Sequence, residues 1–295
     1  MPNDNIEQNI KDILESGATP DEKISALNDL IAGLSFVHQV AEARRVAEAG
    51  ALIAAKAGKT EMAAQFCFMR AKAEIAEAGK FIGEMKNITM AINWFEFGLE
   101  AEKKRFKELD AKLQTNWGIT QKVMNMGYDF INKKPYIGAG AYCQRTAGQI
   151  YGTYYLQLKL HYFTTGRPWR ARFGNYALSR WLGIDDLFIL SKRSRAHLRS
   201  VKRDCIKSLH QAKRLFKRIR AYDYLVETYF DLALEHHSFN DSLRSKFYLW
   251  WGWLLMKWHR LQEPRLAESF ASLRELPLIG SNRDGRPMDE LQPQL

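Results

Sequence analysis

Cysteine is scarce in this chain of 295 residues. The three cysteines, Cys67, Cys143 and Cys205, lie far apart and form no C-x-x-C pair. An odd number without that spacing argues against a disulfide framework and against a zinc cluster. We therefore expect a reducing, cytoplasmic setting and no metal site.

Long hydrophobic runs are also missing. The longest, from Phe247 to Met256, has ten residues with a glycine in its middle, whereas a membrane-spanning helix needs about 20. The first residues, MPNDNIEQNIKDILESG, are polar and acidic where an export signal would be basic and then apolar. We expect no transmembrane segment and no export signal.

Motifs of common catalytic sites are absent as well. There is no G-x-S-x-G turn, no H-E-x-x-H pair and no cysteine within a family signature. The GAG run at residues 138–140 lacks the Gly-Lys-Ser/Thr of a phosphate loop and the preceding strand of a dinucleotide fold. His236 and His237 are adjacent, so on a helix they point to different faces and cannot share an ion. We expect no cofactor and no catalytic residue, although an enzyme built from residues distant in sequence stays open.

One strongly basic stretch, from Ser191 to Arg220, dominates what the sequence does contain. It holds twelve Lys and Arg residues and one acid, Asp204, so its net charge of +11 equals that of the whole chain. It has no glycine or proline, and its apolar residues recur at helical spacing. The sequence predicts an amphipathic helix of about eight turns, with an apolar stripe that packs and a face that is electropositive. The stripe consists of Leu198, Val201, Cys205, Leu209, Ala212, Phe216 and Ile219.

The basic face of this predicted helix needs a negative partner. Like charges on one face repel at i,i+4 spacing, and an ordinary solvated helix relieves this by interleaving glutamate with lysine. An acidic neighbour elsewhere in the fold could neutralise the face, or the face could meet a polyanion such as nucleic acid, an anionic membrane or an acidic protein. We favour a polyanion. The candidate binding residues on this helix are Arg195, Arg199, Lys202, Arg203, Lys207, Lys213, Arg214, Lys217 and Arg218.

A second candidate stretch, TTGRPWRARFGNYALSRWLG at residues 164–183, interleaves arginines with aromatic residues and contains no acid. Arginine beside exposed rings can hold phosphates while the rings stack on bases. The alternative is that the rings are core and the arginines lie over them. We favour the core for Trp181 and phosphate binding for Arg167, Arg170 and Arg172.

The charge is distributed unevenly along the chain. Residues 1–113 and residues 221–295 each carry a net charge of −3, whereas residues 114–220 carry +17. Helix breakers, among them Asn116, Gly118 and Gly127, cluster between residues 114 and 140. We predict an Ala-rich helical module at 1–113, a linker or junction at 114–140, a basic, aromatic-rich helical module at 141–276 and a disordered tail at 277–295.

Helical signals cover most of the chain. The run TPDE at residues 19–22 is a capping box with proline at the first helical position, so a helix should begin near Pro20. Residues 141–164 favour a buried aromatic helix, with a strand as the alternative because Tyr and Thr favour sheets. Residues 242–261 are apolar nearly all round and carry four tryptophans, so we expect a central core helix, with a membrane-interface helix as the alternative. The whole pattern predicts an all-α stack or bundle of about nine to eleven helices.

The stretch IAEAGKFIGEMKNITMAINWFEFGLEA, at residues 75–101, resembles one tetratricopeptide repeat. Gly79, Ala91, Phe95 and Gly98 stand near the small-residue and aromatic positions of that 34-residue motif. Ile82 stands where an aromatic residue is usual, and stepping by one repeat length does not recover the pattern. The resemblance implies a helical-repeat fold with a concave surface that binds protein.

These features lead to three hypotheses about function. The first is a non-catalytic nucleic-acid-binding protein, as a subunit of a larger nucleoprotein complex. The second is a helical-repeat adaptor that binds an acidic protein partner, and the third is a peripheral protein on anionic membranes. No homeodomain, zinc-finger or RNP signature is present, so the choice between RNA and DNA stays open.

Overall fold

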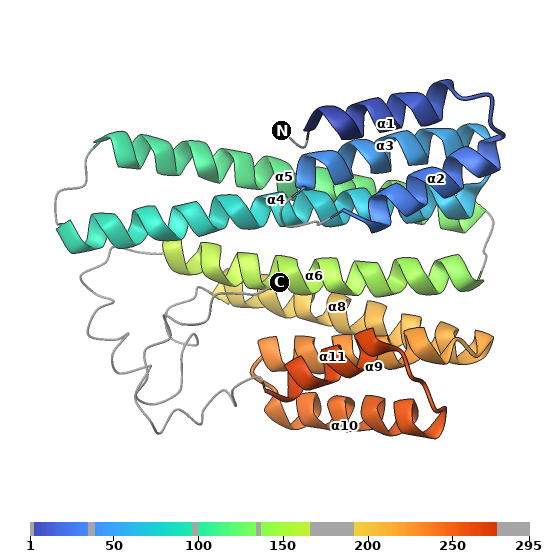
Figure 1. Cartoon of the computed structure of the whole chain (residues 1–295). Coiled ribbons are helices and arrows are strands. Elements are labelled where there is room, and N and C mark those ends of the chain that lie inside the picture. Colours follow the sequence, from blue (N-terminus) through green and yellow to red (C-terminus); the bar gives the residue numbers. More distant parts are fainter. Residues whose placement is uncertain (1–2, 35–38, 96–99, 134–136, 166–191, 276–295) are drawn as a thin grey trace.

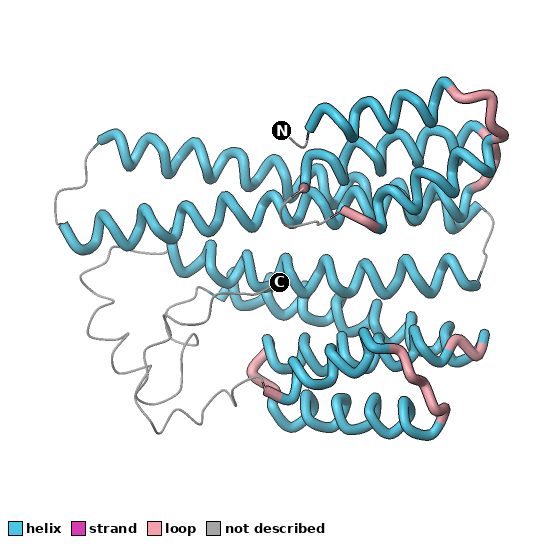
Figure 2. Tube along the Cα trace, in the orientation of Figure 1, coloured by secondary structure: helices cyan, strands magenta, loops and turns pink. Residues whose placement is uncertain are grey.

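The computed structural model describes residues 3–34, 39–95, 100–133, 137–165 and 192–275. Within these ranges the chain forms ten helices and no strand, which confirms the predicted all-α class (Figure 2). The helices are α1 (Asn3–Glu15), α2 (Pro20–Ala32), α3 (Val40–Lys56), α4 (Thr60–Phe95), α5 (Glu100–Lys133), α6 (Ile137–Thr165), α8 (Lys192–Ile219), α9 (Tyr222–Ser238), α10 (Ser242–Trp258) and α11 (Pro264–Arg274).

The start of α2 forms as the sequence predicts. Thr19 is the N-cap, and its hydroxyl accepts a hydrogen bond from the Glu22 backbone N–H at 3.3 Å. The Thr19 N–H in turn donates to Glu22 Oε2 at 2.7 Å, and Pro20 occupies the first helical position. Two backbone donors that a helix end would leave unpaired are therefore satisfied.

The helices stack in layers (Figure 1). The long helices α4, α5, α6 and α8 lie side by side, and the group α1 to α3 packs at one end of α4 through α3. On the other side of the stack, α9 packs against α8 and also contacts α10 and α11. The largest hydrophobic cluster draws on all four long helices, with Phe68, Leu113, Leu158 and Val201 among its buried side chains. Side chains from both predicted modules therefore share one core.

The breakers at residues 114–140 do not end a helix where we expected. Asn116, Gly118 and Gly127 all lie inside α5, which runs without interruption to Lys133. A Cβ atom at Gly127 would stand 2.8 Å from the Phe68 ring, so this glycine lets α4 and α5 approach closely. The expectation that these residues interrupt the helix is wrong, and the division into two modules at this point stays a prediction.

Residues 137–165 form the helix α6, not the alternative strand. Its glycines allow close packing, because a Cβ at Gly148 would lie 2.5 Å from the Leu209 side chain of α8. Tyr151, Tyr154 and Tyr155 are half-buried against the core instead of fully buried. Helix α6 is thus the element against which the basic helix packs.

Helix α10 is not the central core helix that we predicted. It lies at the edge of the stack, where it packs against α9 and α11 (Figure 1). Gly252 and Met256 are its buried residues, and the central position belongs to α9. Four of its large apolar side chains are more than half exposed: Leu243 (81%), Phe247 (54%), Trp250 (51%) and Trp258 (77%).

Two further expectations concern membranes and the tail. Among the described helices, none has the length and apolar character needed to cross a membrane. The tail that we predicted to be disordered, at residues 277–295, lies outside the described residues.

Candidate functional site

The apolar stripe of α8 packs as the sequence predicts. Leu198, Val201, Cys205 and Leu209 are buried, and so are Ala212 and Phe216. These side chains face α6 and α9, the two helices that contact α8 most. Ile219, at the end of the helix, is exposed instead because it lies beyond this contact. The packed stripe fixes which face of α8 is left to solvent.

Seven of the nine predicted cations lie on that exposed face. One ion pair with a described acid reaches them, between Arg203 Nε and Asp204 Oδ1 at 3.9 Å, and Asp204 belongs to α8 itself. The N-terminal helices α1 to α3 pack on one another and, through α3, on α4, and they do not cover α8. Within the described ranges, no other helix supplies an acid that neutralises this face. We call the seven residues the exposed cations of α8: Arg195, Arg199, Arg203, Lys207, Arg214, Lys217 and Arg218.

The other two predicted cations, Lys202 and Lys213, are half-buried and lie over aromatic rings. Lys202 Nζ is 4.9 Å from the centre of the Phe239 ring. Lys213 Nζ is 5.3 Å from the centre of the Tyr229 ring and 5.7 Å from that of Tyr248. Burial lowers the pKa of both ammonium groups. These two lysines therefore hold α8 against the helices beside it.

A shallow hollow of about 490 Å³ opens on the same face. Tyr248 of α10 approaches it, with its hydroxyl 3.4 Å from His210 Nε2. Burial, and then the positive charge of Lys213, lowers the pKa of His210 to about 4, so the ring is neutral at neutral pH. The charge of the hollow therefore comes from its Lys and Arg residues. We call this the α8 hollow, and Lys207, His210, Gln211, Lys213 and Arg214 line it.

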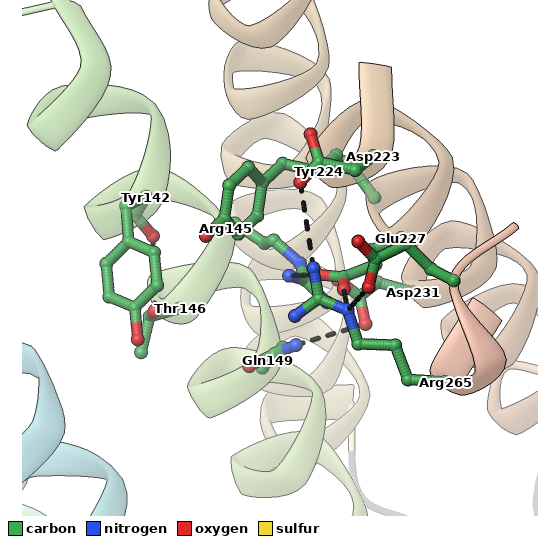
Figure 3. A network of polar contacts seen from close by, with 11 residues as sticks. Tyr142, Arg145, Thr146, Gln149, Asp223, Tyr224, Glu227, Asp231 and Arg265 are labelled. Atoms are coloured by element: carbon green, nitrogen blue, oxygen red, sulfur yellow. Dashed lines mark hydrogen bonds and ion pairs between the residues drawn. The ribbon is translucent and has the colours of Figure 1, made fainter. Parts of the chain in front are cut away.

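A partly buried network of charges fixes α9 and α11 relative to α6 (Figure 3). The guanidinium of Arg145 on α6 pairs with Glu227 and, through Nε, with Asp231 Oδ2 at 2.5 Å, and both carboxylates belong to α9. Gln149 Nε2 donates to Asp231 Oδ1 at 3.0 Å, and Arg265 Nε of α11 lies 3.2 Å from Glu227 Oε1. All the charges in this network are paired, so its role is to position the helices that flank α8.

Sequence reasoning missed this network, although a signal was present. Asp223, Glu227, Asp231 and Glu235 recur every four residues, which places four acids on one face of α9. Such a column repels itself unless cations lie opposite. Arg145 and Arg265 supply those cations from helices remote in sequence.

Glu235, the last acid of that column, is buried against α6 without a cation. A Cβ atom at Gly152 would collide with its carboxylate, so the glycine makes room for the side chain. Its Oε2 has no hydrogen-bond partner within the described part of the chain. Burial, and then the neighbouring charge of Asp231, raises the pKa of Glu235 to about 8. The carboxyl is therefore mostly protonated at neutral pH.

Other chemistry has little support in the described residues. Cys67, Cys143 and Cys205 are buried thiols, and burial raises the pKa of each, which makes them poor nucleophiles. No group of three or more His, Cys, Asp or Glu residues in those ranges could hold a metal ion. The predicted phosphate-binding arginines Arg167, Arg170 and Arg172, and also Trp181, lie outside the described residues.

The fold and this site define an all-α helical stack that carries one strongly electropositive helix face. In comparisons with protein-family models, curated proteins and solved structures, the chain matches none of them. The resemblance to a tetratricopeptide repeat therefore stays a prediction.

Proposed function

We propose that this protein binds nucleic acid without a catalytic step, through phosphate contacts made by the exposed cations of α8. The observation that carries the proposal is the set of seven Lys and Arg side chains on one helix face, which no acid from another described helix neutralises. When such unneutralised cations bind a polyanion, they release its condensed counterions, and this release favours binding.

The dimensions of the face suit an extended polyanion. From Arg195 to Arg218 the helix rises about 35 Å, at 1.5 Å per residue. Double-stranded DNA carries one charge per about 1.7 Å of its axis, so several phosphates could be contacted at once. Phosphate contacts fix position and orientation but carry little sequence information. We therefore expect tight, salt-sensitive binding with low sequence specificity.

The remaining helices suit a subunit of a larger nucleoprotein complex. Helices α1 to α3 lie away from α8, on the far side of α4 and α6 (Figure 1). A partner protein could therefore bind them while α8 contacts nucleic acid.

Charge reversal on α8 tests the proposal. The variant changes four exposed cations to glutamate, and binding to fluorescent single-stranded RNA, single-stranded DNA and duplex DNA is measured at low salt. A matched control makes the same charge change with exposed lysines of α5. Circular dichroism verifies that both variants keep their helices. The α8 variant carries Arg199→Glu, Arg203→Glu, Lys207→Glu and Arg214→Glu, and the control carries Lys104→Glu, Lys107→Glu, Lys112→Glu and Lys122→Glu.

We expect the α8 variant to bind at least about a hundredfold more weakly than the wild type, since each substitution removes a cation from a phosphate and puts a repelling carboxylate in its place. The control should weaken binding far less. Equal effects in the two variants would mean that net charge matters and the α8 face does not. If the wild type binds no nucleic acid even at low salt, the proposal is wrong. Binding to an acidic protein, or sedimentation with phosphatidylserine vesicles but not with neutral ones, would then identify the alternative polyanion.

A further inference from the structure

Aromatic rings of α10 continue outward from the α8 hollow. Tyr248, which contacts His210 of the hollow, packs edge-on against Phe247 with ring centres 5.4 Å apart. Phe247 in turn stacks with Trp251 at 6.2 Å and an interplanar angle of 15°. The next ring, Trp250, is 5.6 Å from Trp251. A continuous row of rings therefore leads away from a cationic hollow.

The outer rings of this row are accessible. Phe247 and Trp250 are each about half exposed, and Trp251 is 37% exposed. The inner ring of the row is held against α9, because the Tyr248 ring contacts that of Tyr229 with ring centres 6.1 Å apart. Tyr229 also lies under the ammonium group of Lys213, which lines the hollow. Fixed rings beside fixed cations form a preorganised surface.

We propose that the α8 hollow and the exposed rings Phe247, Trp250 and Trp251 together bind single-stranded nucleic acid. In this arrangement Lys207, Lys213 and Arg214 hold a phosphate in the hollow, while unpaired bases stack on the rings of α10. This inference rests on the proposed function, because it specifies which nucleic acid the face prefers. Stacking on aromatic side chains tolerates any base sequence, in agreement with the low specificity expected from phosphate contacts.

Three physical points favour a single strand over other occupants. The bases of a duplex are paired and stacked on one another, so their faces are not free for side-chain rings. A bilayer presents a broad surface, whereas the α8 hollow is a small, shallow depression of about 490 Å³ lined by three cations, which suits a single phosphate group. The positive charge of the lining residues complements phosphate, and the rings complement the apolar faces of bases.

Abasic oligonucleotides separate the two parts of the proposal, because they keep the phosphates and lack the bases. We would measure the affinity of the wild type for a single-stranded oligonucleotide, its abasic counterpart and a duplex of equal length. The test variant carries Phe247→Leu and Trp250→Leu, which keep apolar side chains but remove two rings. The matched control, Trp258→Leu, removes an exposed tryptophan at the far end of the same helix.

The wild type should bind the base-containing strand at least about fivefold more tightly than the abasic strand, since one stacked base is worth roughly fivefold to a hundredfold. The test variant should lose most of that preference and keep its affinity for the abasic strand, while the control keeps both. Equal wild-type affinities for the two strands, or a preference for duplex that the test variant retains, would overturn this inference and leave the proposed function intact. If the wild type binds none of the three even at low salt, both fail.

Discussion

Carboxylates on one face of α9 show how the surroundings of a residue decide which partners it has. Glu227 and Asp231 both pair with the guanidinium of Arg145. Glu235, one turn further along, faces Gly152 and has no cation beside it in the described structure. Three acids at equal spacing thus have different surroundings, a distinction that sequence spacing alone could not make. Their partners come from α6, which lies about 80 residues earlier in the chain.

The pH dependence of stability provides a test at this scale. The pKa of Glu235 is about 8 in the folded chain and 4.5 in its ordinary state, so between these values the folded protein binds a proton that the unfolded chain lacks. Its contribution to the free energy of unfolding is therefore fully present below about pH 4.5 and is lost as pH rises to about 8. Glu235→Gln should remove this loss, because glutamine resembles the protonated acid and does not ionise.

The measurement is chemical denaturation of the wild type and Glu235→Gln at about pH 5 and pH 8. From pH 5 to pH 8 the free energy of unfolding of the variant should rise by roughly 3 kcal/mol relative to that of the wild type, since one pKa unit corresponds to about 1.4 kcal/mol. Taking the difference between the two proteins cancels the titration of His210 and His236, whose pKa values are lowered by burial. An equal pH dependence in both proteins would mean that Glu235 is ionised in the folded state.

At the scale of helices, the sequence predicted amphipathic elements well and uniform ones poorly. The capping box at Thr19 and the apolar stripe of α8 are local patterns, so they identified a helix start and a buried face directly. Helix α10 is apolar nearly all round, so its sequence could not indicate which side packs. Helix α5 contains glycines that favour a break, but one of them, Gly127, packs against Phe68, which lies 59 residues earlier in the chain.

Two glycines of α5 give a matched pair of substitutions. Gly118 is exposed, and a Cβ atom added to it would meet no other atom within 4 Å, so Gly118→Ala should stabilise the protein by about 1 kcal/mol through helix propensity. Gly127→Ala gains the same propensity but places a methyl group against Phe68, and overpacking costs about 1–3 kcal/mol. Thermal unfolding should therefore show opposite shifts in Tm. A rise in Tm for both variants would contradict the close approach of α4 and α5.

For the whole molecule, the distribution of charge was the most informative feature of the sequence. It located the electropositive helix, and the structure places seven of its nine predicted cations on a solvent-facing side. The sequence did not reveal that the α8 hollow lies beside Tyr248 of α10, because His210 and Tyr248 belong to different helices and meet only in the fold. It also did not reveal that aromatic residues of α10 lie exposed beside those cations. Both features depend on α9, which contacts α8 and α10 and so sets the distance between them.

The salt dependence of binding tests the central claim most directly. The logarithm of the binding constant for a single strand should fall linearly with the logarithm of salt concentration, with a slope of about −0.7 for each phosphate contacted. If all the exposed cations of α8 contribute, the slope approaches about −5. Arg203→Gln and Lys207→Gln should each make it less steep by about 0.7, whereas Lys107→Gln on α5 should not change it. A slope near zero, or an unchanged slope in both α8 variants, would contradict phosphate binding by this face.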